Sequence, residues 1–301
     1  MENINSINNT DFKVESYIGI SGNYNTYIVN NKNDGLKYIC KSRTSSPQSD
    51  QYESQLYNYL AKQRNMTKFI NPLKTQIIDK SINMTHSFYP VMNGISLARI
   101  TPHLKEMNPD EYQIISRIII KNLLEAIGNL HKIQMIHNNI TPDNIIIELG
   151  KRPLNIKLIN FDFSCGKFQE GNHYLFKKCN QSKKIYNGRG LLNNNHNKVP
   201  PVFQQELVDK KRSDVRMTGL ICLQLLLGDI LPWDQILKSQ PNAELENIYW
   251  ANLKSNPQIR EKILKGYIDL IVYNMLEAPF VRNINPAKYT VDKIITLEKY
   301  N

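Results

Sequence analysis

The chain has 301 residues, 41% of them hydrophobic and 22% charged, and a formal net charge of +11 at pH 7. This composition supplies enough apolar material for a folded core and excludes an intrinsically disordered chain. No apolar run approaches the ~20 residues that span a bilayer, and residues 1–10 are polar and Asn-rich without the apolar segment of a secretory signal. We therefore expect an intracellular, cytoplasmic protein that begins with a polar tail over residues 1–11.

The positive charge comes from scattered lysines and from two local clusters at residues 177–184 and 210–212. Neither cluster has aromatic residues interleaved with its charges, as a base-stacking surface for nucleic acid would. We therefore expect a protein partner rather than nucleic acid, and an acidic partner would suit the charge.

Four cysteines are scattered along the chain, at Cys40, Cys165, Cys179 and Cys222. No two of them form a Cys-x-x-Cys pair, so we expect neither a zinc site nor a disulfide framework. Cys40 and Cys222 lie in apolar segments, where a buried free thiol is the usual state of a cysteine.

The first predicted elements are a hairpin, a strand and a helix. Residues 12–29 alternate between apolar and polar side chains on both sides of a Gly-containing turn, which indicates a β-hairpin. A strand over residues 36–41 ends at Lys41. A helix over residues 50–60 follows, because its apolar residues recur at helical spacing, and this helix carries Glu53.

Two further β-prone runs, at residues 75–78 and 87–92, complete a small antiparallel sheet and end at the turn dipeptide Asn93-Gly94. Beyond this turn the apolar residues of 109–133 recur at the spacing of a long helix. A change from strands to helices at residue 93 predicts two structural parts that meet there.

A polar loop begins at His137, and two short β-branched strands follow it at residues 145–147 and 156–159. Residues 165–201 then show neither helical nor strand periodicity. Residues 214–227 begin with an Asp at a helix start and are apolar all round, as a fully buried helix is. Amphipathic helices are predicted again over residues 248–275.

The stretch between residues 136 and 164 resembles the catalytic and metal-binding loops of the eukaryotic protein kinases, whose pattern is His-Arg-Asp, four residues, Asn, and later Asp-Phe-Gly. The matching positions are His137 and Asn138 for His-Arg, Asn139 for the catalytic Asp, Thr141 for the loop Lys, Asn144 for the metal-binding Asn, and Asn160-Phe161-Asp162 for Asp-Phe-Gly. An amide at Asn139 cannot act as a base near neutral pH. An amide at Asn160 offers a hard cation one neutral oxygen in place of a carboxylate.

The N-terminal elements fit the same resemblance. Gly19, Gly22 and Asn25 resemble the Gly-rich loop that covers the phosphates, with Asn, which tolerates positive φ, at the third glycine. A plain hairpin turn explains these residues equally well when they are taken alone. Lys41 resembles the strand Lys that contacts the phosphates, and Glu53 resembles the helix Glu that pairs with it.

Towards the C-terminus, the helix that begins at Asp214 resembles the central helix of the large kinase lobe, whose Asp holds the backbone of the catalytic loop. The sequence Leu-Pro-Trp at residues 231–233 is similar to the casein-kinase-like and vaccinia-related branch. Residues 285–292 resemble the closing Asp-Pro-x-x-Arg-Pro-Thr signature, with Lys288 in place of its Arg.

The resemblance implies an α+β, bilobal protein-kinase-like fold, with a small antiparallel β-sheet lobe plus a large helical lobe. The N-lobe would span residues 12–92 and the C-lobe residues 93–301, with an activation-like segment over residues 160–201.

The implied function is that of a catalytically impaired protein kinase homologue, a pseudokinase, which binds ATP and acts as a regulatory or scaffolding module. Asn139, at the position of the catalytic Asp, is expected to be inactive, and Asn144 and Asp162 offer at most a weak site for magnesium. The expected nucleotide contacts are Gly19, Gly22, Asn25, Lys41, Glu53, Met92 and Asn144.

Two alternatives stay open at this point. One is a divergent but active Ser/Thr protein kinase that transfers the ATP γ-phosphate to protein, with Asp143 or Asp162 supplying the missing carboxylate. The other is a nucleotide-free interaction module that acts through its basic surface. The abundance of Asn, Ile and Lys suits an AT-rich parasite or a large DNA virus, for which the site of action would be the host cytoplasm.

Overall fold

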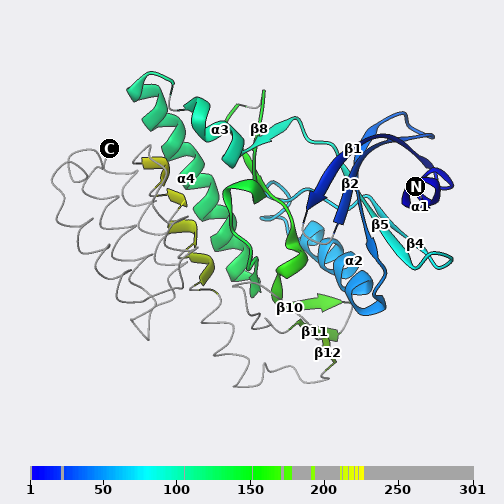
Figure 1. Cartoon of the computed structure of the whole chain (residues 1–301). Coiled ribbons are helices and arrows are strands. Elements are labelled where there is room, and N and C mark those ends of the chain that lie inside the picture. The colour runs from blue at the N-terminus through cyan, green and yellow to red at the C-terminus, as the bar shows by residue number, and fades with distance from the viewer. Residues whose placement is uncertain are drawn as a thin grey trace, which may run out of the picture.

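The computed structural model describes residues 2–21, 24–104, 106–150, 152–170, 173–177 and 191–193, and the positions 211, 213–215, 217–219, 221–222 and 224–226. The described part has a β-sheet at its N-terminal end and a helical part beyond it (Figure 1). None of the helices in these ranges combines the length and the hydrophobicity that crossing a bilayer needs. Gly22 and the helices predicted beyond residue 226 lie outside the described residues.

The N-terminal part is built on a five-stranded antiparallel sheet with the strand order β1-β2-β3-β5-β4. Its strands are β1 Phe12–Ser21, β2 Tyr24–Asn31, β3 Lys37–Thr44, β4 Thr75–Asp79 and β5 Met84–Pro90. The hairpin predicted over residues 12–29 is confirmed, because β1 and β2 pair from Phe12 opposite Asn31 to Ser21 opposite Tyr24. Helix α2, Pro47–Lys62, connects β3 to the second half of the sheet.

The two faces of the sheet carry different side chains because residues alternate along a strand. On β3, Tyr38, Cys40 and Ser42 are buried on one face, which we call the outer face. Ile39, Lys41 and Arg43 therefore lie on the opposite, inner face, towards α2 and the helical part. The apolar cluster of the outer face consists of Ile7, Phe12, Tyr27, Val29, Tyr38, Cys40 and Phe88.

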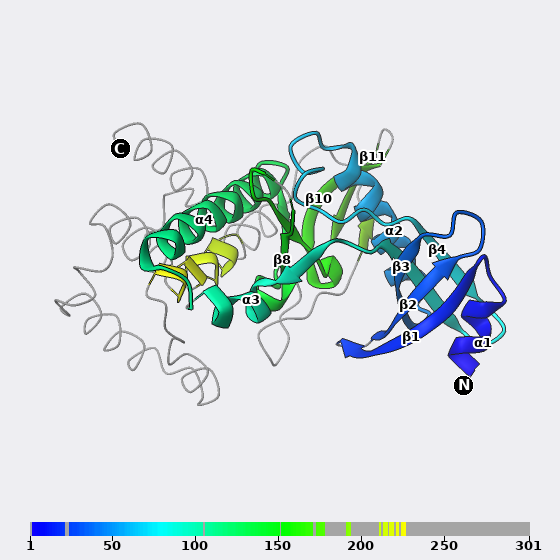
Figure 2. The ribbon, with the colours of Figure 1, turned by 90° about the horizontal axis from the view of Figure 1, so that it is seen from above.

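The prediction of a polar tail over residues 1–11 is wrong for its central part, because residues Glu2–Asn8 form helix α1. Ile7 is 0% exposed, and Ile4 packs against the same outer-face cluster. Two isoleucines three residues apart give this short helix an apolar side that the surrounding polar residues hide in the sequence. Figures 1 and 2 show α1 beside the sheet at the end of the molecule remote from α4.

The helical part begins after residues 91–93 with β6 Gly94–Ser96, α3 Leu97–Leu104 and α4 Pro109–Lys132. The long helix predicted over residues 109–133 is thus confirmed, and its first turn is capped by Asn108, whose side chain accepts a hydrogen bond from the Asp110 backbone. The two predicted short strands are also confirmed as β8 Ile145–Glu148 and β9 Ile156–Leu158, which pair antiparallel.

Three strands lie in the segment for which no strand was predicted: β10 Cys165–Glu170, β11 His173–Lys177 and β12 Leu191–Asn193. They join β7, Met135–Ile136, in a four-stranded sheet. A glycine is required at position 166, where β10 pairs with β7, because a Cβ there would lie 2.2 Å from the Gln134 carbonyl oxygen. Backbone contact, rather than an alternating side-chain pattern, defines this sheet, which explains why the sequence did not reveal it.

One continuous core joins α2, α4 and the strands that follow α4. Phe69 and Phe161 are among its fully buried side chains. Val215, Ile221, Cys222 and Leu225 belong to the same core, and all the described positions from 211 to 226 are helical. The buried helix predicted to start at Asp214 is therefore confirmed over its described positions.

Cys165 is disulfide-bonded, which the spacing of the cysteines did not predict. Cys40 and Cys222 are buried free thiols, as predicted. Spacing along the chain does not fix which cysteines meet in space, which is the condition for a disulfide.

His86 on β5 ties α1 to the sheet. Its Nε2 lies 2.9 Å from the Ser6 hydroxyl and its Nδ1 lies 2.7 Å from the Ser42 hydroxyl. Ser6 donates its single proton to the Asp79 carboxylate, so it accepts one from Nε2, and Nδ1 is left to accept from Ser42. This arrangement uses neutral His86, and burial lowers the pKa of its imidazole although the nearby Asp79 opposes that shift.

The first prediction concerns pH. Because the folded pKa of His86 lies below its ordinary value of 6.5, the unfolded chain binds more protons as the pH falls below that value. The free energy of unfolding should therefore decrease on acidification from pH 7.5 to 5.5, with a slope of at most about 1.4 kcal/mol per pH unit from this one group. Urea unfolding at several pH values measures the slope.

In the His86→Gln variant this slope should become shallower. The matched control is His103→Gln, since the His103 side chain is 71% exposed and its removal should leave the slope unchanged. Equal slopes for the wild type and His86→Gln would show that the network of Ser6, His86 and Ser42 does not depend on neutral imidazole.

Candidate functional site

The loop that begins at His137 is fixed by a carboxylate far along the chain. Asp214, which is 2% exposed, accepts hydrogen bonds from the backbone N–H groups of His137 at 2.8 Å and Asn138 at 2.9 Å. The ring of His131 lies 3.2 Å from the same carboxylate. Asn138 has a positive φ of 59°, a conformation that Asn adopts more readily than most residues. Asp214 thus holds the loop backbone in the manner that the kinase resemblance implies.

His137 and Phe161 connect this loop to α2. His137 is 0% exposed, and its Nε2 lies 3.1 Å from the Ile159 carbonyl oxygen. Its ring centroid lies 4.6 Å from that of Phe161, which in turn lies 5.8 Å from Tyr57 on α2. Burial lowers the pKa of His137, so it serves as a neutral scaffold residue.

One lysine, two side-chain amides and one backbone carbonyl form a continuous chain of hydrogen bonds. Lys41 Nζ donates to Asn160 Oδ1. Asn160 Nδ2 donates to Asn144 Oδ1 at 2.6 Å, and Asn144 Nδ2 donates to the Asn139 backbone oxygen at 2.9 Å. A lysine ammonium has no acceptor, so Asn160 must turn its oxygen to Lys41 and its amide N–H groups to Asn144. The order of donors and acceptors along this chain is therefore fixed by chemistry.

These residues do not fit a magnesium ion as they stand. Magnesium prefers anionic oxygens in octahedral geometry. Here the oxygens of Asn144 and Asn160 already accept hydrogen bonds, and the group that Asn160 presents to Asn144 is a donor. Within the described ranges, no three His, Cys, Asp or Glu side chains gather in a way that could hold a metal ion.

Asp162 acts electrostatically on Tyr24, Arg43 and Glu53, and also on His137 of the loop. The weak metal site expected from Asn144 and Asp162 stays a prediction.

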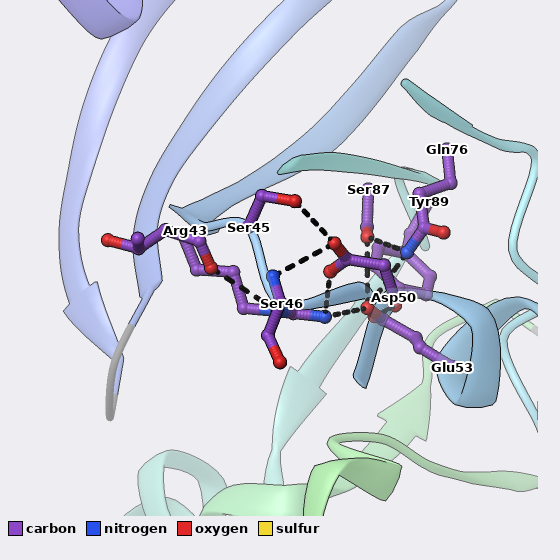
Figure 3. A network of polar contacts seen from close by, with 9 residues as sticks. Arg43, Ser45, Ser46, Asp50, Glu53, Gln76, Ser87 and Tyr89 are labelled. Carbon is purple, nitrogen blue, oxygen red and sulfur yellow. Dashed lines mark hydrogen bonds and ion pairs between the residues drawn. The ribbon is translucent and has the colours of Figure 1, made fainter. Parts of the chain in front are cut away.

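The predicted ion pair between Lys41 and Glu53 is wrong, because Arg43 takes the place of Lys41. Arg43 Nη2 lies 2.5 Å from Asp50 Oδ1 and 3.5 Å from Glu53 Oε2 (Figure 3). Arg43 stands two residues after Lys41 on the same face of β3, and its longer, forked side chain reaches both carboxylates of α2. The kinase pattern ends at Lys41, so it did not predict that Arg43 would pair with these carboxylates instead.

Glu53 is further held by three donors from the sheet. It accepts hydrogen bonds from the Tyr89 hydroxyl, from Ser87 Oγ at 3.1 Å and from Gln76 Nε2 at 3.1 Å (Figure 3). Burial raises the pKa of Glu53, and Asp162 adds to the rise, while Tyr89, Arg43 and Lys41 oppose it. At the start of α2, Asp50 Oδ2 accepts from Ser45 Oγ at 2.7 Å and from the Ser46 backbone at 3.0 Å.

The remaining predicted nucleotide contacts lie on the hairpin and between the two parts. Gly19 has φ of 145° in β1, beside a register shift between Tyr17 and Gly19. Asn25 is an ordinary residue of β2 without the positive φ expected of it, and its Oδ1 accepts from the Tyr17 hydroxyl at 3.3 Å. Met92 is half-buried in the connection between β5 and β6.

Tyr24 belongs to the site although the sequence analysis did not single it out. It is 9% exposed, and Lys41 Nζ lies 5.4 Å and Arg43 Cζ 5.8 Å from its ring centroid. The alternation of β2 could have placed Tyr24 on the inner face, but its contacts depend on the register of the hairpin.

The sheet order, helix α2 on the inner side of the sheet and the loop held by Asp214 define an α+β, bilobal protein-kinase-like fold. The chain is 26% identical over 151 residues to the Probable serine/threonine-protein kinase mps1 of Dictyostelium discoideum. This alignment covers 48% of the chain and 14% of that relative, and it supports a kinase-like relationship. No family model matches the chain.

The second prediction compares the two inner-face cations. Arg43→Met should lower the free energy of unfolding by about 3–5 kcal/mol, because it leaves the buried carboxylates of Asp50 and Glu53 without their cation. Lys41→Met removes one hydrogen bond to a neutral amide and should cost about 1–2 kcal/mol. Urea unfolding at pH 7.5 measures both. Equal losses for the two variants would indicate that Lys41, and not Arg43, anchors α2.

Proposed function

We propose that this protein is a pseudokinase, a kinase-like protein that does not transfer phosphoryl groups and that acts as a regulatory or scaffolding module for a protein partner. The observation that carries the proposal is the hydrogen bond from Asn160 to Asn144. Phosphoryl transfer of the kinase type needs a carboxylate that holds magnesium against the phosphates, and here two neutral amides bond directly to each other.

The alternative sources of a carboxylate are poorly placed for this chemistry. Asp143 is exposed, whereas its neighbour Asn144 is buried at 6% exposure, so the two side chains lie in opposite surroundings. Asp162 is engaged with Tyr24 and lies near Arg43 and Glu53. These placements support the pseudokinase over the divergent active kinase.

The proposal includes nucleotide binding without a metal ion. In a kinase, magnesium offsets the negative charge of the phosphates together with that of the carboxylates around them. Asn139 and Asn160 remove the charge of the two carboxylates that the family pattern places here. The lysine that would meet the phosphates is present, since Lys41 Nζ bonds to Asn160. ATP can therefore be held by Lys41 with less need for a cation between phosphate and protein.

The third prediction tests nucleotide and metal together. ATP in EDTA at about 100 Kd should stabilise the fold by roughly 2.7 kcal/mol, and adding magnesium should not increase that shift. Thermal unfolding with and without each ligand measures both effects. Purified protein should transfer no radiolabel from ATP to a general protein substrate.

The variant Asn160→Asp provides the matched comparison, because it restores one anionic oxygen beside Lys41. Its ATP shift should become dependent on magnesium. A magnesium-dependent shift in the wild type, with radiolabel transfer that Lys41→Met abolishes, would establish the active kinase instead. Absence of any shift in the wild type would leave the nucleotide-free interaction module.

A further inference from the structure

Tyr24 occupies a position that the proposed function leaves unexplained. It is the first residue of β2 and lies opposite Ser21 at the closed end of the hairpin. A tyrosine at a hairpin tip can point to solvent at no cost, yet this one is turned under the sheet and is 9% exposed. Tyr17 on the same hairpin is 52% exposed, so burial is not a general property of its tyrosines.

The ring of Tyr24 covers the two cations of the inner face. Lys41 Nζ lies 5.4 Å from its centroid and Arg43 Cζ 5.8 Å, both within the range of cation–π attraction. Burial raises the pKa of the Tyr24 phenol, and the nearby Asp162 adds to the rise. Tyr24 is held to β3 through its ring.

The groups that contact the Lys41 ammonium directly are neutral, although its charge also acts on the Glu53 carboxylate. Its ammonium bonds to Asn160 Oδ1 and lies between the ring of Tyr24 and the ring of Tyr89, which is 5.6 Å away. No carboxylate of the described residues forms an ion pair with it. A phosphate group would be a stronger partner for this ammonium than any of its present neighbours, but the Tyr24 ring lies over it.

We propose that Tyr24 is a gate over the phosphate end of the nucleotide site, which rests on the proposed function for the identity of the ligand. With the gate in place the site accepts a nucleoside, and a nucleotide polyphosphate binds only after the Tyr24 ring has left Lys41. The site therefore discriminates against the polyphosphate in favour of the nucleoside.

The hairpin provides a point at which such a movement can begin. Gly19 lies opposite Thr26, two residues along the strand from Tyr24, and β1 changes register beside it. A Cβ added at Gly19 would meet no atom within 4 Å, so open space borders the strand there. The hairpin tip can turn at this position without disturbing the outer-face cluster, of which neither Gly19 nor Tyr24 is a member.

The fourth prediction uses two independent readouts on Tyr24→Ala. Trace acetylation with acetic anhydride, followed by peptide mass spectrometry, reports how accessible Lys41 is without any nucleotide. In the wild type, Lys41 should label at least tenfold more slowly than Lys37, whose side chain is 55% exposed. Tyr24→Ala should raise the labelling of Lys41 about tenfold. It should also lower the Kd for ATP in EDTA about tenfold and leave the Kd for adenosine within a factor of three.

Two control variants separate the ring from its surroundings. Tyr24→Phe keeps the ring and should label as slowly as the wild type. Tyr17→Ala removes a tyrosine from the same hairpin away from Lys41 and should also label as the wild type. If Tyr24→Ala does not fold, the labelling rates of Lys41 and Lys37 in the wild type still test the gate, because equal rates would overturn it.

The outcomes distinguish the gate from the proposed function. Faster labelling of Lys41 in Tyr24→Ala, with no binding of ATP or adenosine to any variant, would uphold the cover over Lys41 and overturn nucleotide binding. Unchanged labelling, with equal ATP affinity in the wild type and Tyr24→Ala, would overturn the gate and uphold nucleotide binding.

Discussion

The hydrogen bond between the side chains of Asn160 and Asn144 determines what the site of this protein can do. Two carboxylates, or a carboxylate and an amide oxygen, repel each other at short range and need a cation between them. Two amides have a donor and an acceptor each, so they join directly, here at 2.6 Å, and Lys41 extends the chain through its own hydrogen bond. The side chains of Asn144 and Asn160 therefore satisfy each other without an ion between them.

Much of this arrangement followed from local sequence patterns. Alternation predicted the first hairpin, helical spacing predicted α4, and β-branched runs predicted β8 and β9, since each element has a face that must be buried. The all-apolar run after Asp214 predicted a buried helix. The amide positions at Asn139 and Asn160 could be read from the order of residues around them, because a loop between fixed elements keeps its spacing.

Features that depend on contacts between residues far apart in the sequence could not be predicted from local patterns. Lys41 and Arg43 lie on the same face of β3 because they are two residues apart. Only the packing of α2 decides which of these two cations pairs with Glu53, and in the structure it is Arg43. Helix α1 is held by the contact between Ser6 and His86, which lie far apart in the sequence. Tyr24 became part of the site through the hairpin register, and the disulfide bond of Cys165 did not follow from the spacing of the cysteines.

The pairing of Arg43 with α2 has a consequence for how a signal could cross this molecule. Where one lysine contacts both a helix and a ligand, binding of the ligand can shift the helix, and the two are coupled. Here the contacts are divided between two residues: Lys41 bonds to Asn160, and Arg43 pairs with Asp50 and Glu53. The anchorage of α2 at Asp50 and Glu53 therefore does not require Lys41.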